Sequence, residues 1–162
     1  RLNGGHCCCS GTFRYLRYAY SALDQALKEM IKELLNGEDN ELFHTSIEHE
    51  LKEVFESNAA MLSILLDSFP TLCDLIPHGW STREVIDYSC RMPLLKRALS
   101  EVIRIVMRHR TTPLVFVFED VHDADSDSRE LLLHLIKSLL LDNTPNLLFV
   151  VSFDYQASRF VL

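Results

Sequence analysis

The stretch from Pro113 to Asp125, PLVFVFEDVHDAD, decides the fold. Within it, residues 114–118 form a short, wholly apolar run of β-branched, aromatic and leucine side chains, entered through a proline and closed by acids. This pattern is typical of a β-strand that is buried on both faces, as in a parallel sheet. The stretch therefore predicts a core strand with two acids, Glu119 and Asp120, at its carboxyl end.

A second apolar run, at residues 147–151, follows the turn-forming sequence Asn-Thr-Pro-Asn at 143–146. Between the two runs, a helix is predicted to begin at a cap formed by Asp125 or Ser126 and to reach about residue 141. Its inner side carries Leu131, Leu132, Leu135, Ile136 and Leu139. Strand, helix and strand make a βαβ unit, so the two strands should lie parallel with a right-handed crossover.

Helical periodicity, with apolar residues three and four apart, fills most of the chain before this unit. It predicts a helix over 21–35, two helices within 41–67 and one helix over 89–110. We expect Ser21 to cap the first helix, Gly37 to end it, and Asn58 to mark the break between the next two. Pro93 should be tolerated because it would lie in a first turn. The fold class is α/β with a large helical insertion ahead of the sheet.

A purely helical adaptor is the alternative, in which both apolar runs are buried ends of helices. Their short length, their β-branched and aromatic content, and the flanking Pro and Asp favour strands. One observation separates the two interpretations. In the α/β fold, residues 114–118 and 147–151 must lie as adjacent parallel strands.

Composition places the chain among globular proteins, because 48% of its 162 residues are hydrophobic and 24% are charged. The formal net charge of −7 argues against a nucleic-acid platform, which needs a basic face. No apolar run approaches the roughly 20 residues that cross a bilayer, so no membrane partner is expected. The start, Arg1-Leu2-Asn3, has neither Met nor a targeting profile, and we interpret it as internal to a longer protein.

Five cysteines are present, with Cys7, Cys8 and Cys9 consecutive and Cys73 and Cys90 isolated. An odd number in this arrangement is no disulfide framework and favours reduced thiols, which predicts a cytoplasmic protein. A zinc site built from the triplet and the preceding histidine is the alternative. It is disfavoured because adjacent residues cannot easily all turn toward one tetrahedral ion.

The two acids at 119 and 120 need a physical reason. Ligands of open parallel sheets bind beyond the carboxyl ends of the strands. Two neighbouring carboxylates there are unfavourable unless a cation, a water network or protonation offsets their charge. Mg²⁺ with a nucleotide phosphate is an economical answer, since one acid can hold the shell of the ion while the other orients water. The alternative is that the acids merely end the strand and cap the segment after it.

Residues 113–135, PLVFVFEDVHDADSDSRELLLHL, resemble the Walker B segment of AAA/STAND-type predicted ATPases, relatives of the origin-recognition-complex-like AAA domain, often written PLVLVLDDLHWADPASLELL. The resemblance continues elsewhere: GTF at 11–13 and YSAL at 20–23 are similar to the family's GKFDQ and PYSAL segments, SFPTLCDLIP at 68–77 to its "P.L..L.G" stretch, and residues 147–152 to its sensor strand. The resemblance implies a partial P-loop NTPase (AAA-like) sheet. Residues 1–20 would follow the P-loop helix, 21–110 would be a helical region, and 111–162 would hold the Walker B strand, helix and sensor strand.

Matched to the family pattern, Glu119 is the Mg²⁺ ligand, acting through water, and Asp120 is the catalytic acid that positions the attacking water. Ser152 falls at the polar sensor position near the γ-phosphate, so these three residues would bind the cofactors ATP and Mg²⁺. His122 and Asp125 match the family's HWAD loop, and His122 receives no proton-transfer role.

Three departures from the pattern limit what these residues can do. Asp123 replaces the family's Trp, and Asp154 stands where its GTYR segment has Arg. No GxxxxGK[ST] occurs, although that loop supplies the N–H cradle and the lysine for the phosphates. The chain by itself is therefore expected to bind ATP poorly and to be inactive.

Two functions are implied by the resemblance. The first is part of an ATP-binding and ATP-hydrolysing signalling ATPase, whose nucleotide state governs self-association or an attached kinase, histidine kinase or cyclase domain. The second is a non-catalytic interaction or scaffold module, in which Asp123 and Asp154 mark lost chemistry. A P-loop upstream of this chain would favour the first function.

Overall fold

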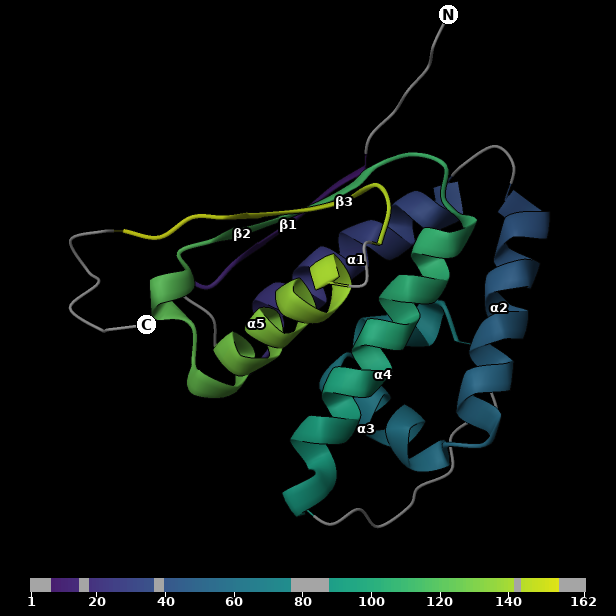
Figure 1. The fold of residues 1–162 in the computed structure, drawn as a ribbon, viewed down its shortest axis with the longest axis horizontal. Coiled ribbons are helices and arrows are strands. Elements are labelled where there is room, and N and C mark those ends of the chain that lie inside the picture. Colours follow the sequence, from purple (N-terminus) through teal and green to yellow (C-terminus); the bar gives the residue numbers. More distant parts are fainter. Residues whose placement is uncertain (1–6, 15–17, 37–39, 77–87, 142–143, 155–162) are drawn as a thin grey trace, which may run out of the picture.

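The computed structural model describes residues 7–14, 18–36, 40–76, 88–141 and 144–154. Within these described residues, three parallel strands form one sheet in the order β1-β2-β3, and the helices lie on one side of that sheet (Figure 1). The strands are β1 (Cys7–Thr12), β2 (Leu114–Glu119) and β3 (Leu147–Val151). The molecule is thus α/β, with β2 in the middle of the sheet.

The predicted βαβ unit is confirmed. Strands β2 and β3 are parallel neighbours, with Leu114 opposite Leu147 and Phe118 opposite Val151. Helix α5 (Ser126–Leu141) connects them. This pairing excludes the purely helical adaptor.

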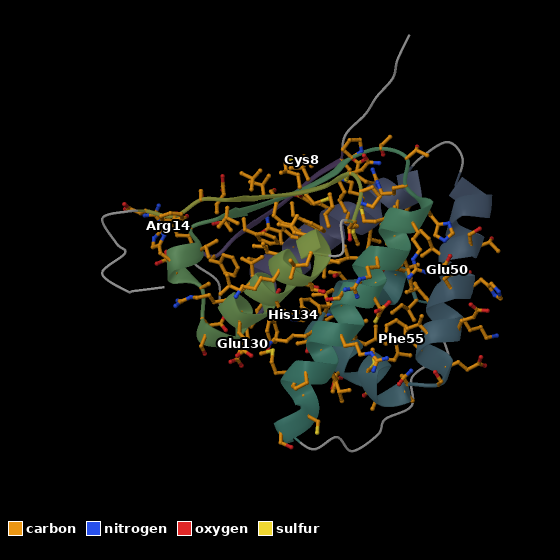
Figure 2. All side chains as sticks on the ribbon, viewed as in Figure 1. Cys8, Arg14, Glu50, Phe55, Glu130 and His134 are labelled. Atoms are coloured by element: carbon orange, nitrogen blue, oxygen red, sulfur yellow. The ribbon has the colours of Figure 1, made fainter. Side chains whose placement is uncertain are left out.

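The strand β1 was not predicted. Its sequence, CCCSGT, lacks the Val, Ile and aromatic residues that signal a strand, yet it pairs in parallel with β2 along its whole length. Alternation along the strand buries Cys7 and Cys9 under the helices and leaves Cys8 on the opposite face, where Figure 2 shows it. The triplet therefore cannot turn three thiols toward one ion. The histidine considered with them lies outside the described residues.

The predicted helices are confirmed. They are α1 (Ser21–Asn36), α2 (Asn40–Glu56), α3 (Ala59–Ser68) and α4 (Tyr88–His109), with a short 3-10 turn, η1 (Pro70–Asp74), after α3. Asn58 lies at the break between α2 and α3, as predicted. Across the described parts of the chain, no helix combines the length and the apolar character needed to cross a bilayer.

Two predictions about helix starts were wrong. Ser21 does not act as the cap of α1, because its hydroxyl donates to the Tyr18 carbonyl, 2.8 Å away, and Tyr20 precedes the first turn with a left-handed backbone. Pro93 lies inside α4, beyond its first turn, because the helix already begins at Tyr88. A proline there removes one helical hydrogen bond. The predicted stop at Gly37 lies outside the described residues.

The core lies between the sheet and the helices. On β2, the side chains of Leu114, Phe116 and Phe118 are buried, and the two rings stack with centroids 6.1 Å apart. The other side of the sheet is bare: Leu148 and Val150 of β3 keep 54% and 43% of their surface exposed, and no described helix covers them (Figure 1). The sheet therefore has one packed face and one open apolar face.

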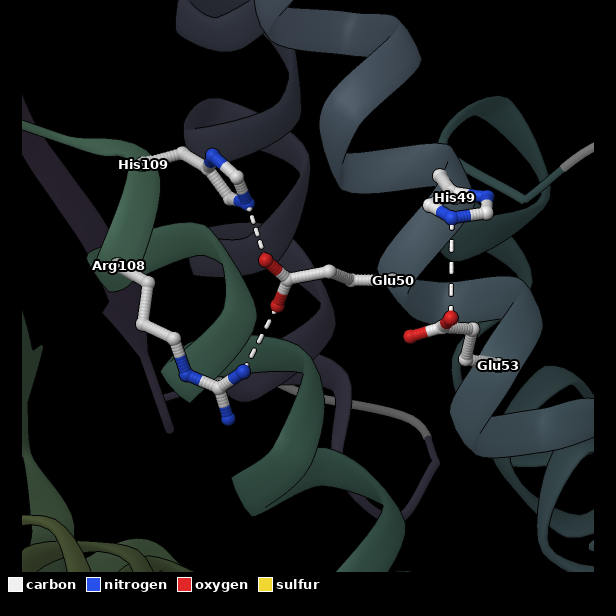
Figure 3. A network of polar contacts seen from close by, with 5 residues as sticks. All are labelled: His49, Glu50, Glu53, Arg108 and His109. Atoms are coloured by element: carbon white, nitrogen blue, oxygen red, sulfur yellow. Dashed lines mark hydrogen bonds and ion pairs between the residues drawn. The ribbon is translucent and has the colours of Figure 1, made fainter.

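A charged contact joins α2 to α4 (Figure 3). The Glu50 carboxylate accepts one hydrogen bond from Arg108 Nη1 and another from His109 Nε2, both 2.8 Å long. The nearby ion pair between His49 and Glu53, 3.7 Å apart, joins two exposed side chains of the same helix. Only the Glu50 contact connects two different helices of this figure.

We expect Glu50→Gln to lower the free energy of unfolding by about 1 kcal/mol, because the carboxamide keeps one acceptor oxygen and loses the charge that two partners share. Urea unfolding followed by circular dichroism measures the change. Glu53→Gln is the matched control, and its effect should be within about 0.5 kcal/mol of zero. Equal effects of the two variants would show that the contact between helices adds nothing.

Candidate functional site

The predicted acidic pair lies at the tip of the central strand, as expected. Glu119 is the last residue of β2, and Asp120 follows it directly. The alternation that buries Phe116 and Phe118 places Glu119 on the opposite, open face of the sheet, where its side chain is exposed. The sheet thus presents this carboxylate at its carboxyl edge, on the side that no described helix covers.

Asp120 turns the chain sharply out of the sheet. Its backbone is left-handed, with φ 55° and ψ 40°, a conformation that non-glycine residues rarely adopt and that Asp tolerates better than most. The turn continues as a short 3-10 segment, η2 (Val121–Asp123), in which the Asp123 N–H donates to the Asp120 carbonyl at 2.9 Å. Such a backbone costs of order 1 kcal/mol and persists where the surroundings fix it.

Backbone hydrogen bonds from both neighbouring strands fix this turn. The Ser152 N–H donates to the Phe118 carbonyl at 2.9 Å, and the Val121 N–H donates to the Ser152 carbonyl at 3.1 Å. From the other side, the Phe13 N–H donates to the Glu119 carbonyl at 3.0 Å. The structure therefore brings Ser152 beside the acidic pair, and its exposed side chain lies at the same edge.

Thr12 is a neighbour of this site that sequence reasoning missed. It pairs in register with Glu119 and ends β1 at the same edge of the sheet. Its side-chain oxygen accepts a hydrogen bond from the Arg14 N–H at 3.3 Å. The sequence did contain the Gly-Thr-Phe segment at 11–13, but it gave no sign that this segment ends a strand. That became clear only because the structure includes the preceding cysteines in β1.

His122 makes contacts that hold the loop together. Its Nδ1 accepts a hydrogen bond from the Asp154 N–H at 3.2 Å, so in that contact Nδ1 carries no proton. Its Nε2 lies 3.6 Å from Asp123 Oδ1. The imidazole thereby ties the η2 turn to the segment after β3.

Asp125 caps helix α5, one of the two predicted caps. Its Oδ1 accepts from the N–H groups of Asp127 and Ser128 at 3.1 and 2.9 Å, and its Oδ2 accepts from the Ser128 hydroxyl at 2.5 Å. The Ser128 oxygen in turn accepts from the Tyr20 N–H at 2.8 Å. Asp125 thus connects the start of α5 to the segment that enters α1, and these contacts account for it as a structural residue.

We expect Asp125→Ala to lower the free energy of unfolding by about 2 kcal/mol, since the first turn of α5 loses its acceptors. Burial alone would raise the pKa of Asp125, but hydrogen bonds from the Ser128 side chain and from backbone N–H groups lower it overall. A lowered pKa stabilises the fold fully above the pKa of the unfolded chain, near 3.9, and this stabilisation is lost as pH falls through the folded value. Urea midpoints at pH 7 and pH 3 should therefore differ less in Asp125→Ala than in the parent, and an equal pH dependence would contradict the cap.

A cavity of about 450 Å³ lies next to this loop, on the side of the helices. Its lining includes Phe13 and Tyr18 together with the acids Asp123, Asp125 and Asp127. Glu119, Asp120 and Ser152 do not line it. The three residues predicted to bind nucleotide and metal therefore share an edge with one another but not this cavity.

Chemically, the carboxyl edge of the sheet offers oxygen atoms that could bind a cation, and they come from the ends of all three strands. The carboxylates of Glu119 and Asp120 and the hydroxyl groups of Thr12 and Ser152 are the ligand types that a hard cation such as Mg²⁺ takes. Comparison of the chain with protein-family models, with curated proteins and with solved structures finds no match. The argument for a function therefore rests on the residues of this edge and on their arrangement.

Proposed function

We propose that this chain is part of an ATP-binding and ATP-hydrolysing signalling ATPase of the AAA/STAND type. In this proposal Glu119 holds Mg²⁺ through water, Asp120 orients the attacking water, and Ser152 contacts the γ-phosphate. The observation that carries the proposal is the position of the acidic pair at the carboxyl end of the middle strand of a parallel sheet, with Ser152 hydrogen-bonded beside it. Ligands of such sheets bind at this end.

The open face of the sheet supports the same proposal. The connections from β1 to β2 and from β2 to β3 run in one direction across the sheet, so right-handed crossovers place their helices on one face. A crossover that runs the opposite way would place its helix on the open face. A strand before β1 in sequence, placed at the free edge of β3, would make such a crossover.

That arrangement would also complete the binding site. The strand order would reverse between β3 and the added strand, and ligands bind where the order of an open sheet reverses. The reversal would lie beside Ser152 and the acidic pair. A strand, P-loop and helix in this place would supply the phosphate cradle that the chain lacks and would bury Leu148 and Val150.

The described residues fit the expected cofactors. Mg²⁺ accepts one or two carboxylates and keeps several waters, which suits an exposed Glu119 that reaches the ion through water. When bound, the ion would neutralise charge on the phosphates. Asp120 is half-buried and its backbone is held by the turn, so its side chain leaves the chain at the carboxyl edge of the sheet, where it could orient the attacking water.

The second candidate is a scaffold or interaction module that keeps the fold without hydrolysis. It is favoured by one observation, the absence of Glu119 and Asp120 from the lining of the neighbouring cavity. Asp123 and Asp154, which replace Trp and Arg of the family pattern, agree with it. In this alternative the open face would bind a protein partner instead of an intramolecular helix.

Binding of a fluorescent ATP analogue to the full-length protein, with and without Mg²⁺, tests the proposal. We expect Mg²⁺ to increase the affinity for the analogue. Glu119→Gln should lower the affinity measured with Mg²⁺ about tenfold, because a carboxamide is a poorer partner of the hydrated ion. Glu53→Gln, which changes an exposed acid on α2, is the control. If the full-length protein shows no Mg²⁺-dependent binding, the ATPase proposal is wrong.

A further inference from the structure

Helices α4 and α5 face each other across a groove, whose exposed lining consists mostly of the apolar parts of polar and charged side chains. The groove has a volume of about 420 Å³ and is lined by Pro93, Lys96, Arg97, Ser100 and Arg104 of α4 and by His134 and Ser138 of α5. Successive lining residues are mostly three or four apart, so each set follows one face of its helix. Figure 2 marks His134 and, near it, Glu130 of the same helix. None of these residues belongs to the candidate nucleotide site.

Direct bonds between the two helices lie toward each end of the groove. At one end, Lys96 Nζ donates to Glu130 Oε1 at 2.6 Å. At the other end, Arg104 Nη2 donates to the Ser138 hydroxyl at 2.7 Å. One helical turn in from each end lie Ser100 on α4 and His134 on α5, which form the middle of the groove.

The hydroxyl of Ser100 lacks a partner. The side chain retains only 1% of its surface exposed, and its oxygen makes no hydrogen bond within the described residues. A buried hydroxyl that has lost water without gaining another partner is unfavourable. Because Ser100 also lines the groove, a ligand in the groove could supply the missing bond.

The charges around this hydroxyl are mainly positive. Lys96 and Arg104 lie one turn on either side of it, and the exposed Arg97 is at the rim. Burial lowers the pKa of His134, and the neighbouring Lys96 and Arg104 lower it further. Glu130 and Glu101 each already pair with one of these cations. An anion in the middle of the groove would therefore be attracted, and its presence would favour protonation of His134.

We propose that the groove between α4 and α5 is a binding site for a phosphate group, either free phosphate or the phosphate of a small phosphorylated molecule. The Ser100 hydroxyl, the Arg97 guanidinium and the His134 ring are the donors that would contact its oxygens. Arginine and hydroxyl donors suit phosphate, which accepts several hydrogen bonds at once. The groove is larger than a single phosphate, so an attached group can also be accommodated.

Titration of the chain with inorganic phosphate, followed by the NMR signals of the His134 ring, tests this site. We expect saturable binding that raises the pKa of His134, whereas sodium chloride at equal ionic strength should leave that pKa nearly unchanged. Ser100→Ala and Arg97→Gln should each weaken binding about tenfold, the loss of one hydrogen bond to a charged group. Arg108→Gln makes the same change of charge on the same helix, in the contact with Glu50, and should leave binding unchanged.

Glycerol 3-phosphate provides the second arm. Tighter binding than that of inorganic phosphate identifies a phosphorylated molecule as the ligand, and weaker binding identifies free phosphate. Equal responses to phosphate and chloride would show charge screening alone and overturn the proposal. Unchanged phosphate binding in Ser100→Ala would also overturn it, because the hydroxyl would then be satisfied by water. Ser100→Ala should remain folded, since removing an unpaired buried hydroxyl should not lower the free energy of unfolding. A loss of phosphate binding in this variant would therefore not result from unfolding.

Discussion

Gly11→Ala is expected to destabilise the protein by about 3 kcal/mol or more, at the upper end of the cost of overpacking a core. Gly11 of β1 lies directly under the first turn of α1. A β-carbon at this position would meet the Ala22 carbonyl oxygen at 2.0 Å and the carbonyl carbon at 2.8 Å. Both atoms belong to the backbone, so no side-chain rotation relieves the clash, and α1 would have to move away from the sheet.

Urea unfolding followed by circular dichroism measures this effect. Cys8→Ala is the matched control, because Cys8 lies on the same strand with its exposed side chain on the open face. Its midpoint should stay close to that of the parent. If Gly11→Ala also kept the parent midpoint, the close approach of β1 and α1 would be wrong, and with it the position of β1 in the sheet.

The elements that the sequence predicted well carry a strong periodic signal. Residues 114–118 and 147–151 combine β-branched and aromatic side chains with short length, and the two runs became β2 and β3. The helices were predicted from apolar residues three and four apart. In these segments local preference and burial agree, so the pattern of one chain suffices.

The strand β1 could not be predicted because its residues carry little preference of their own. Cys7 and Cys9 are buried like small apolar residues, and Gly11 is required by the approach of α1, but a run of cysteines and a glycine suggests a metal site or a loop as readily as a strand. Partners distant in sequence decide its conformation: it pairs with β2 and packs against α1. The same reason explains why the predicted cap at Ser21 was wrong. The Ser21 hydroxyl donates to a carbonyl three residues earlier instead of accepting from a helix N–H.

The candidate site was predictable as a position but not as a set of contacts. Hydrophobic pattern alone placed Glu119 and Asp120 at a strand end, and the rule for parallel sheets placed the end of the next strand nearby. Sequence could not reveal the left-handed turn at Asp120, which depends on backbone bonds to Ser152. Nor could it show that Thr12 is in register with Glu119, since that register depends on the unrecognised strand.

The proposed ATPase function predicts that Asp120→Asn, in the full-length protein, reduces the turnover of ATP about a hundredfold while changing the affinity for ATP by less than about threefold. Asn keeps the shape of Asp and also tolerates the left-handed backbone at this position, so the turn should persist. The substitution removes the negative charge and the ability to take a proton from water. Turnover should therefore fall without loss of binding, which separates a catalytic carboxylate from a structural one.

Steady-state hydrolysis and equilibrium binding, measured on the same preparations, check this expectation. Asp123→Asn is the matched control, because it removes an exposed acid from the same loop, three residues further along the chain. Its turnover should stay within about threefold of the parent. Equal hydrolysis by the parent and by Asp120→Asn would remove Asp120 from the mechanism, and a parallel loss of binding and turnover would assign it to holding the loop. Loss of turnover with unchanged binding is the one result that fits a carboxylate acting on the attacking water.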